Sequence, residues 1–548
     1  MQSKKFVRIL SMVLAVTAVC TLYSGCKTSS TAQQVIKYNL GAEPATADPA
    51  LNNAVDGAIV IVNTFEGLTR INEKEIAVKA VATDWKISAD GLTYTFTLRN
   101  DAKWSDGQPL KAGDFEYAWK RALNPDTAAE YAYQLYYLKN GEAYNSKKAS
   151  ADDVGVKALN DTTLEVKLEY PTPYFLNLCA FPTYMPVRKD VVEKDKAWFT
   201  KPETFICDGA FKLKEWKPKD TIVLEKNPNY YDSKSVKLDR LEMKMLEDAT
   251  SYLQAFKSGT LDYIESPPSA EVPTLLQDKT AVSVPYLGNY FYVINLTSKA
   301  DKVDPAAAKV LKDVKVRKAL AYAINRKDIV EKVMRGGQIP ATTLVPPNIP
   351  IDEKGTDFKN KDYYKPEGDI ATAKKLLADA GYPGGKGFPK ITILYNTGSG
   401  HQNVAVAIQE MWKTNLGIDV QLQNQEWKVF QKTRTDKDYT VARHGWIADY
   451  VDPMTFLDMW VSNSGQNDAG YSNPEYDKLI NAARREPDKA KRVQLLHQAE
   501  DVIMNDMPII PLYYYKNIVC IKPYVKGTYK SVLGFVYFQN AYVDKTAK

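Results

Sequence analysis

R-H-G-W-I-A-D-Y-V-D-P-M-T-F-L, residues 443–457, is the stretch that guides the interpretation of the whole chain. An apolar-leaning segment before it predicts a strand, and Pro453 ends that strand. Asp449 lies between an alanine and a tyrosine, so we expect its carboxylate to be shielded from solvent. A buried charge is costly unless it has a cationic partner or several hydrogen-bond donors. Arg443 is the one residue nearby in the sequence that can neutralise it, and the ammonium group of a ligand is the alternative.

Two hypotheses follow for Asp449. Asp and Tyr before a proline are common in turns, and Arg443 and Asp449 can form an ordinary internal ion pair. In that case the segment has a purely structural role. In the second hypothesis the carboxylate faces a cavity and binds a cationic group. The rest of the sequence provides the evidence for choosing between them.

The amino-terminal residues predict export from the cytoplasm. Basic residues precede an apolar run over residues 9–22, the pattern of a signal peptide, which we assign to residues 1–25. The small residues before Cys26 resemble the lipobox of bacterial lipoproteins, although a tyrosine stands where an aliphatic residue is usual. We therefore expect a lipid on Cys26 and a polar tether over residues 26–34. Ordinary secretory cleavage that leaves a free thiol is the alternative.

Composition excludes several classes of protein. The chain has 72 Lys and Arg against 66 Asp and Glu, which gives a net charge of +6. Loss of the three basic residues of the signal peptide leaves +3, which is too balanced for a nucleic-acid-binding protein. No later segment of the sequence is long and apolar enough to predict a membrane-spanning helix.

The five cysteines do not make a disulfide scaffold. Cys20 is removed with the signal peptide, and Cys26 is expected to carry the lipid. Cys179, Cys207 and Cys520 remain, so at most one disulfide forms within the chain, and the sequence does not decide whether it does. The stability of the protein must therefore come from its size, since about 520 mature residues suffice for several domains.

The pattern of apolar residues predicts an α/β protein. Apolar and polar residues alternate with a period of two over residues 92–98 and 164–168, which predicts strands. A strand over 391–395, a helix that ends at Gly417 and a strand over 418–422 form a βαβ unit. Strands and helices mixed in this way indicate α/β lobes.

The sequence lacks the motifs of catalysis and of metal binding. It contains three histidines, His401, His444 and His497, far apart, and no H-E-x-x-H or C-x-x-C motif. No P-loop or G-x-G-x-x-G sequence supports phosphate binding. Residues 398–401, G-S-G-H, lack the full nucleophile motif G-x-S-x-G, and we interpret them as a glycine-rich turn. The sequence therefore predicts no enzymatic activity, no cofactor and no metal.

Three separated runs, residues 90–121, 380–394 and 443–457, resemble the oligopeptide-binding proteins of peptide ABC importers. These are extracytoplasmic solute-binding proteins of family 5, and the likeness extends over residues 36–543. The resemblance implies an α/β, periplasmic-binding-protein-like fold of two lobes, with an extra domain, mixed sheets and a hinge between the lobes.

The resemblance also implies how the mature chain is divided. The core domain of lobe I is discontinuous, whereas lobe II is one continuous segment. The lobe I core comprises residues 35–68, 190–293 and 509–548, the additional domain of lobe I comprises 69–189, and lobe II comprises 294–508.

The resemblance implies a set of ligand-binding residues. Asp449 matches the acid that holds the α-ammonium of a peptide, and Arg443 matches the arginine that faces the carboxylate of a short peptide. The other matches are Gly445, Trp446 and Ile447, along an edge that bonds the peptide backbone, and Glu43, Tyr290 and Asn295, in the wall of the opposite lobe. Some relatives have a disulfide at positions that look equivalent to Gly288 and Ile447, and neither is a cysteine here.

The expected protein is a monomeric, extracytoplasmic receptor, anchored to the cell membrane by Cys26, that binds oligopeptides and delivers them to the permease subunits of an ABC transporter. A receptor of the same fold for a dipeptide, a metal chelate or a sugar, or a sensor of signalling peptides, is the alternative. The pair Asp449 and Arg443 favours peptides, because a sugar receptor has no need for an enclosed acid that matches an ammonium. A surface peptidase is poorly supported, because no nucleophile and base occur together. Peptide length, side-chain preference and the cognate permease are not determined by the sequence.

Overall fold

An 11-stranded mixed sheet connects the two halves of the protein. The computed structural model describes residues 33–352 and 354–546, so the predicted signal peptide and Cys26 lie outside the described residues. In spatial order the strands are β15 (Val420–Gln425), β14 (Ile391–Asn396), β16 (Val441–Ile447), β12 (Ala281–Ile294), β17 (Ile509–Ile521), β11 (Tyr263–Glu265), β1 (Val35–Asn39), β10 (Arg240–Lys244), β9 (Thr221–Lys226) and β8 (Phe211–Lys217), and β13 (Ile339–Pro340) pairs with β17.

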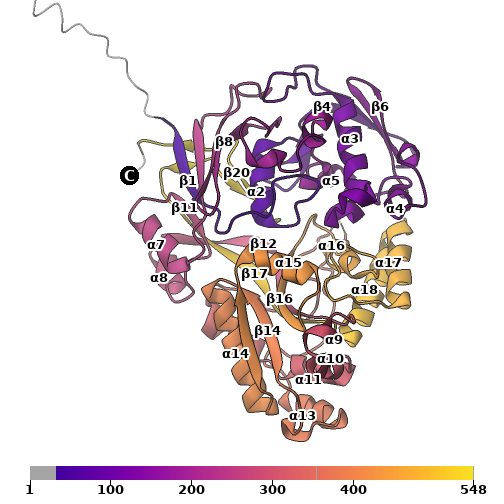
Figure 1. The fold of residues 1–548 in the computed structure, drawn as a ribbon, viewed down its shortest axis with the longest axis vertical. Helices are drawn as coiled ribbons and strands as arrows, with labels where there is room; N and C mark the ends of the chain where they lie inside the picture. The colour runs from indigo at the N-terminus through magenta and orange to yellow at the C-terminus, as the bar shows by residue number, and fades with distance from the viewer. Residues whose placement is uncertain (1–32, 353, 547–548) are drawn as a thin grey trace, which may run out of the picture. The chain divides into compact units, whose positions relative to one another are not determined.

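Two long strands, β12 and β17, run through both lobes (Figure 1). The first part of β12, residues 281–285, pairs with residues 516–520 of β17, which lie beside β11 in lobe I. The last part of β12 pairs with the start of β17 and with β16 in lobe II. The register shifts between Pro285 and Asn289, where proline cannot donate a backbone hydrogen bond. The two strands thus cross from one lobe to the other where the pairing of β12 with β17 is interrupted.

A four-stranded antiparallel sheet, separate from the main sheet, lies within residues 69–189. The alternation predicted over residues 92–98 is confirmed, because Tyr94, Phe96 and Leu98 are buried while the threonines between them are more exposed. The helix α3 (Ala112–Leu123) buries Phe115 and Trp119 against this domain. The strands are β4 (Ala82–Ile87), β5 (Thr93–Leu98), β7 (Thr163–Lys167) and β6 (Val156–Asn160), in that order.

Lobe II contains the predicted βαβ unit, in which β14 and β15 are parallel and α14 connects them. α14 ends at Gly417, which has a φ of 70° and closes the helix in the left-handed conformation. The turn predicted at residues 398–401 was wrong, because α14 begins at residue 399 and only Gly398 lies outside it. The main helices of lobe II are α11 (Val314–Tyr322), α13 (Ile370–Asp379), α14 (Ser399–Leu416), α15 (Trp427–Thr435), α17 (Pro474–Arg485) and α18 (Lys489–Asp506).

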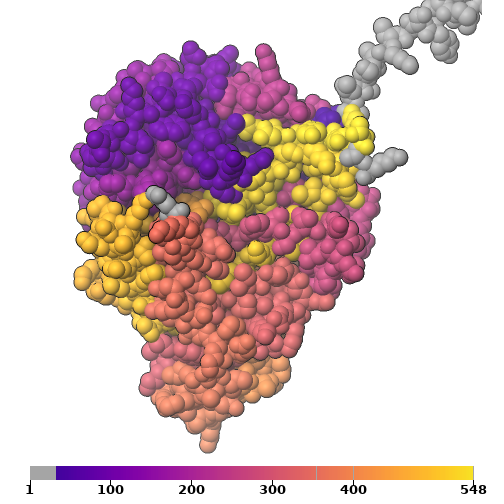
Figure 2. Space-filling view, turned by 180° about the vertical axis from the view of Figure 1, so that it is seen from behind, coloured from indigo at the N-terminus to yellow at the C-terminus, as the bar shows by residue number. Residues whose placement is uncertain are grey.

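The C-terminal part of the chain completes lobe I. After β17, residues 522–546 pack on the first helix of lobe I, α2 (Val55–Thr64), where Asn63 bonds the backbone of Val536 and Phe538. Figure 2 shows these C-terminal residues in yellow, bordering the indigo and magenta residues of the same lobe. The α/β architecture with mixed sheets is confirmed. Within residues 33–352 and 354–546, no helix is both long and apolar enough to cross a bilayer.

Candidate functional site

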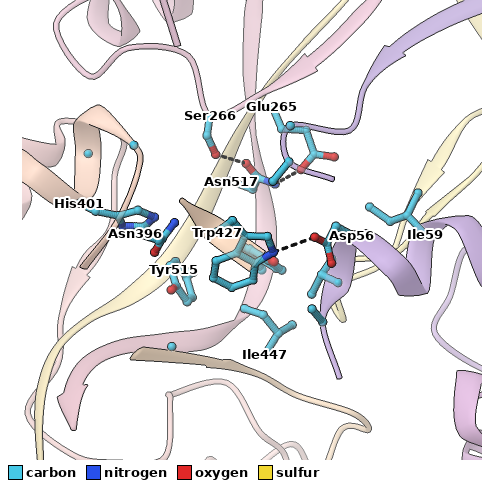
Figure 3. Close-up of a pocket in the computed structure, with 18 of the residues that line it drawn as sticks. Asp56, Ile59, Glu265, Ser266, Asn396, His401, Trp427, Ile447, Tyr515 and Asn517 are labelled. Carbon is cyan, nitrogen blue, oxygen red and sulfur yellow. Dashed lines mark hydrogen bonds between the residues drawn. The ribbon is translucent and has the colours of Figure 1, made fainter. Parts of the chain in front are cut away.

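A cavity of about 520 Å³ lies where the two lobes meet. Figure 3 shows α2 of lobe I facing Trp427 and Ile447 of lobe II, with Tyr515 of β17 between them and His401. The seven consecutive residues 443–449 all line this cavity. The stretch that stood out in the sequence is therefore part of the wall of a concave site between the lobes, a place where ligands are expected to bind.

Asp449 is 5% exposed and lies two residues after the end of β16. Its carboxylate accepts hydrogen bonds from Gln134 Nε2 at 2.5 Å, Tyr131 Oη at 3.3 Å and Tyr133 Oη at 3.4 Å. These donors belong to a 3₁₀ helix of the additional domain, residues 130–135, so the acid of lobe II is held by lobe I. No Lys or Arg of the described chain lies within ion-pair distance of it. Burial raises the pKa of Asp449 well above its usual value, the charge of Asp458 adds to this, and the neutral donors oppose it.

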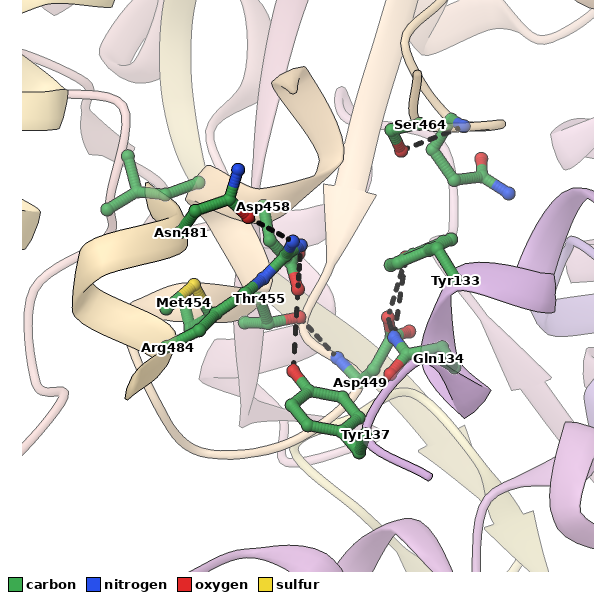
Figure 4. A network of polar contacts seen from close by, with 12 residues as sticks. Tyr133, Gln134, Tyr137, Asp449, Met454, Thr455, Asp458, Ser464, Asn481 and Arg484 are labelled. Atoms are coloured by element: carbon green, nitrogen blue, oxygen red, sulfur yellow. Dashed lines mark hydrogen bonds and ion pairs between the residues drawn. The ribbon is translucent and has the colours of Figure 1, made fainter. Parts of the chain in front are cut away.

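Asp458 is the second carboxylate of this region, and Arg484 neutralises it (Figure 4). The Nη2 of Arg484, on α17, lies 3.7 Å from Asp458 Oδ2, which also accepts hydrogen bonds from Tyr137 and Tyr450. Burial raises the pKa of Asp458 to about 6, and Arg484 counteracts the increase. Two buried carboxylates thus share one cation, and the charge of Asp449 remains uncompensated.

Arg443 has the opposite imbalance. Its Nη2 donates to Tyr515 Oη at 3.4 Å, and its guanidinium carbon lies 5.1 Å from the centre of the Tyr290 ring. Its Nε has no partner in the described structure. No carboxylate of the described residues lies within ion-pair distance of Arg443, so the hypothesis of an internal Arg443–Asp449 ion pair was wrong. The cavity therefore contains an acid and a base that do not neutralise each other.

The predicted residues Gly445, Trp446 and Ile447 line the cavity. A Cβ on Gly445 would lie 2.3 Å from Tyr515 Oη, so this position has no room for a side chain. Trp446 stacks on Tyr131 with ring centres 6.0 Å apart. β14 pairs with β16 only at residues 441–442, so along residues 443–447 that edge of the strand has no neighbouring strand in the described chain.

The structure places three predicted residues away from the cavity wall, and this part of the prediction requires correction. Glu43 accepts a hydrogen bond from Trp216 Nε1 at 3.2 Å and is not among the lining residues. Tyr290 is fully buried in β12, on the lobe II side, and stacks on Tyr513 beneath Arg443. Asn295 is buried and bonds the carbonyl oxygens of Lys437 and Tyr439. The sequence around these three residues did not show whether their side chains pack inside a lobe or line the cavity.

Sequence reasoning missed the residues of lobe I that contact Asp449. Tyr131, Tyr133 and Gln134 belong to the run Y-A-Y-Q-L-Y-Y, and the density of polar aromatic residues in this run was the available signal. Trp427 and Asp56, which bond each other across the cavity at 2.8 Å, gave no comparable signal. Their proximity arises from folding, since 371 residues separate them.

The three described cysteines are not among the residues that line the cavity. Cys179, Cys207 and Cys520 are free and buried. Gly288 lies opposite Ile447 in the pairing of β12 with β16. Within the part of the chain that the structure describes, no group of three or more His, Cys, Asp or Glu side chains is arranged to hold a metal ion.

Comparisons with known proteins agree with this architecture. The family model described as "Bacterial extracellular solute-binding proteins, family 5 Middle" matches residues 77–468. The chain is 42% identical to the oligopeptide-binding protein OppA of Bacillus subtilis over 527 residues, which cover 94% of each chain. The solved structure of Haemophilus influenzae OppA in complex with RPPGFSPFR is 34% identical, with a TM-score of 0.86, over 94% of this chain and 99% of that one.

A third relative indicates which conformation the structure represents. The murein tripeptide-binding protein MppA of Escherichia coli is 35% identical over 94% of this chain and 99% of that one, with a TM-score of 0.85. Its unliganded open form, covered to 98%, gives a TM-score of 0.60. The lobes of the present structure are therefore not arranged as in that open form. The fold and the family model together show that this chain belongs to family 5 of the bacterial extracellular solute-binding proteins, a family that binds solutes and is not enzymatic.

Proposed function

We propose that this protein is an extracytoplasmic receptor that binds oligopeptides in the cavity between its lobes and delivers them to an ABC importer. The observation that carries the proposal is the carboxylate of Asp449, which is buried at the cavity wall and has neutral donors but no cationic partner among the residues described. An α-ammonium group supplies that partner. The oligopeptide-binding relatives named above support the same ligand class.

Three features of the site match the groups that all peptides share. Asp449 receives the α-ammonium, and Arg443, which lacks a carboxylate, receives the C-terminal carboxylate of a short peptide. The unpaired edge of β16 over residues 443–447 bonds the peptide amides as an added strand does. A charge-assisted hydrogen bond contributes about 1.5–3 kcal/mol net. The two charged ends therefore determine the register of the peptide in the cavity. Hydrogen bonds to the peptide backbone add affinity for peptides of different lengths.

Ligand binding is coupled to closure of the lobes in this proposal. The donors to Asp449 belong to the additional domain of lobe I, whereas Asp449 itself belongs to lobe II. A cation bound to Asp449 therefore lies where the lobes meet and favours the closed arrangement. The closed form is then the signal that the permease subunits of the importer recognise.

We further propose that the mature protein is a monomer held at the cell membrane by a lipid on Cys26. The basis is the sequence before Cys26 and the polar tether after it, residues 26–34. The three-domain division remains part of the proposal, with residues 294–508 in lobe II and with β12 and β17 shared between the lobes.

Isothermal titration calorimetry with blocked and unblocked peptides tests the proposed ligand class. A tripeptide or tetrapeptide with free ends is expected to bind, its N-acetylated form to bind at least about 100-fold more weakly, and its C-terminal amide to lose about tenfold. Equal affinity for the acetylated and free forms would contradict the role of Asp449. Mass spectrometry of ligands that co-purify with the protein distinguishes peptides from a sugar or a metal chelate.

A further inference from the structure

The cavity contains more unpaired carboxylates than the two ends of a peptide can use. Its lining carboxylates are those of Asp56, Glu247, Glu265 and Asp449. Glu265 accepts a hydrogen bond from Lys530 Nζ at 2.7 Å, and this ion pair accounts for its charge. The other three have no Lys or Arg within ion-pair distance in the described residues.

The cations of the cavity wall do not restore the balance. Its lining cations are Arg434, Arg443 and Lys516. Arg434 is bound to Asp468 at 2.7 Å, so it is already paired. Arg443 and Lys516 are left to anionic groups of the ligand, whereas Asp449 takes its ammonium. A peptide with two charged ends provides one carboxylate for these two cations, so two unpaired carboxylates, Asp56 and Glu247, remain against one unpaired cation of the wall.

Asp56, one of these unpaired carboxylates, is hydrogen-bonded to Trp427. Asp56 is the second residue of α2, where its Oδ1 accepts a hydrogen bond from the backbone of Gly57 at 2.8 Å. Its Oδ2 accepts from Nε1 of Trp427, the first residue of α15, at 2.8 Å (Figure 3). A carboxylate thus lies at the edge of an indole ring, and the face of an indole also attracts cations.

A neutral side chain beside this pair has an unused acceptor. Gln431, one helical turn after Trp427, is 5% exposed and lines the cavity. Its Nε2 donates to Asn53 Oδ1 at 3.4 Å, and Asn53 lies three residues before Asp56 in the sequence. The Oε1 of Gln431 has no hydrogen-bond partner in the described structure. Because buried polar atoms are almost always bonded, this oxygen is an acceptor that a donor in the cavity can use.

The surrounding charges are also negative. Burial raises the pKa of Glu247, Glu426 of lobe II raises it further, and Lys219 offsets part of this effect. Glu130, the first residue of the 3₁₀ helix of lobe I, accepts a hydrogen bond from Asn53 Nδ2 at 2.6 Å. The electrostatic environment of Asp56 and Gln431 therefore favours a cation that carries several N–H donors.

We propose that Asp56, Gln431 and the ring of Trp427 form a subsite for the side chain of a lysine or arginine of the bound peptide. The inference rests on the peptide-binding function proposed above and specifies the chemistry of its ligand. An ammonium or guanidinium group supplies the charge for Asp56 and the donor for Gln431 Oε1, while the aliphatic stem packs on the indole. The same contacts join the lobes, so a basic side chain also strengthens closure.

The test is calorimetry on a tetra-alanine series in which one position at a time carries lysine or norleucine, which has a similar length and no charge. At one position the wild-type protein is expected to bind the lysine peptide about tenfold more tightly than its norleucine counterpart. In Asp56→Asn, which keeps an oxygen for Trp427 Nε1, the advantage of the lysine peptide over the norleucine peptide is expected to fall to within about twofold.

Two further variants separate recognition from lobe contact. Trp427→Phe keeps a ring but removes the bond to Asp56 and weakens the attraction of the ring for a cation, so both peptides are expected to bind more weakly and the lysine peptide to lose more. Gln431→Leu is expected to reduce the lysine advantage alone. Equal binding of lysine and norleucine at every position, or an equal loss for both in Asp56→Asn, would overturn the subsite and leave peptide binding intact. If no peptide of the series binds, the proposed function itself is overturned.

Discussion

Asp449 and Asp468 are both buried beside β16, with 5% and 3% of their surface exposed, yet their surroundings differ completely. Asp468 accepts hydrogen bonds from Arg434 Nε at 2.7 Å and from His444 Nε2 at 3.1 Å. Asp449 accepts them only from neutral side chains within the described chain, those of Tyr131, Tyr133 and Gln134.

The two carboxyl groups titrate in opposite directions for this reason. Burial alone would raise the pKa of Asp468, but the Arg434 guanidinium and His444 outweigh it and hold the pKa below its usual value. Burial and the charge of Asp458 raise the pKa of Asp449. Burial and Arg434 lower the pKa of His444 to about 4, so at neutral pH this side chain is an uncharged donor. A carboxylate that is already paired stabilises the wall, whereas one that lacks a cation is available to a ligand.

Loss of Asp468 is expected to give the largest effect. Asp468→Ala leaves Arg434 buried without its partner and should lower the free energy of unfolding by about 3–5 kcal/mol. Urea denaturation followed by circular dichroism measures this change. Asp84→Ala is a control, because the Lys79–Asp84 pair is exposed and its loss should change stability by no more than about 1 kcal/mol. If both variants lost a similar amount of free energy of unfolding, the buried pair of Asp468 with Arg434 would not stabilise the protein more than an exposed pair does.

Asp449→Asn should change binding rather than stability. The amide keeps the shape of the side chain but cannot balance an ammonium, so affinity for a peptide with a free amino terminus should fall about 100-fold. Affinity for the N-acetylated peptide should not change, which is the internal control. If the variant is destabilised as strongly as Asp468→Ala, the contrast between the two acids is wrong.

The pH dependence of binding sharpens the contrast. An ammonium pairs with the ionised form of Asp449, whose pKa is raised in the unliganded protein. Affinity should therefore be complete above that pKa and fall by about tenfold per pH unit as the pH drops through it. Once Asp458, with a pKa of about 6, is protonated, its charge no longer raises the pKa of Asp449, so the loss becomes less steep below that pH. In Asp449→Asn the dependence due to Asp449 should disappear, which calorimetry between pH 4 and 8 would detect.

The smallest effect concerns the unliganded protein. Because the folded-state pKa of Asp449 is raised, its contribution to stability is present below the unfolded pKa and is lost as the pH rises through the folded pKa. Asp449→Asn removes this cost, so at pH 8 its melting temperature should exceed that of the wild-type protein by about 1–3 °C. Calorimetric scans without peptide measure the difference, and a lower melting temperature would argue against an unmet charge.

The sequence predicted the environment of Asp449 better than the identity of its neighbours. Its apolar neighbours and the proline that ends the strand indicated a shielded carboxylate, because these effects are local. The donors Tyr131, Tyr133 and Gln134 lie more than 300 residues away in sequence. Tertiary contacts of this kind leave no local pattern, so only the fold reveals that they meet.

The incorrect assignments have the same physical origin. The family resemblance led us to expect Tyr290 and Asn295, in and next to a tyrosine-rich strand, in the wall of the opposite lobe. That strand, β12, passes from lobe I into lobe II, so its later residues pack under Arg443 and beside β16. A strand that serves two lobes cannot be divided by sequence pattern alone, because apolar residues occur on both sides of the crossing. In the structure, residues 282–287 are exposed or partly exposed, whereas residues 288–294 are all buried.

The interrupted pairing between Pro285 and Asn289 has a mechanical consequence. A continuous ladder resists torsion because rotation of one part against another must break interstrand hydrogen bonds. Here residues 286–288 of β12 have no partner in β17, so rotation at this point breaks few hydrogen bonds between these two strands. We therefore expect closure of the lobes to cost little free energy, so that the contacts of a bound ligand are sufficient to stabilise the closed arrangement.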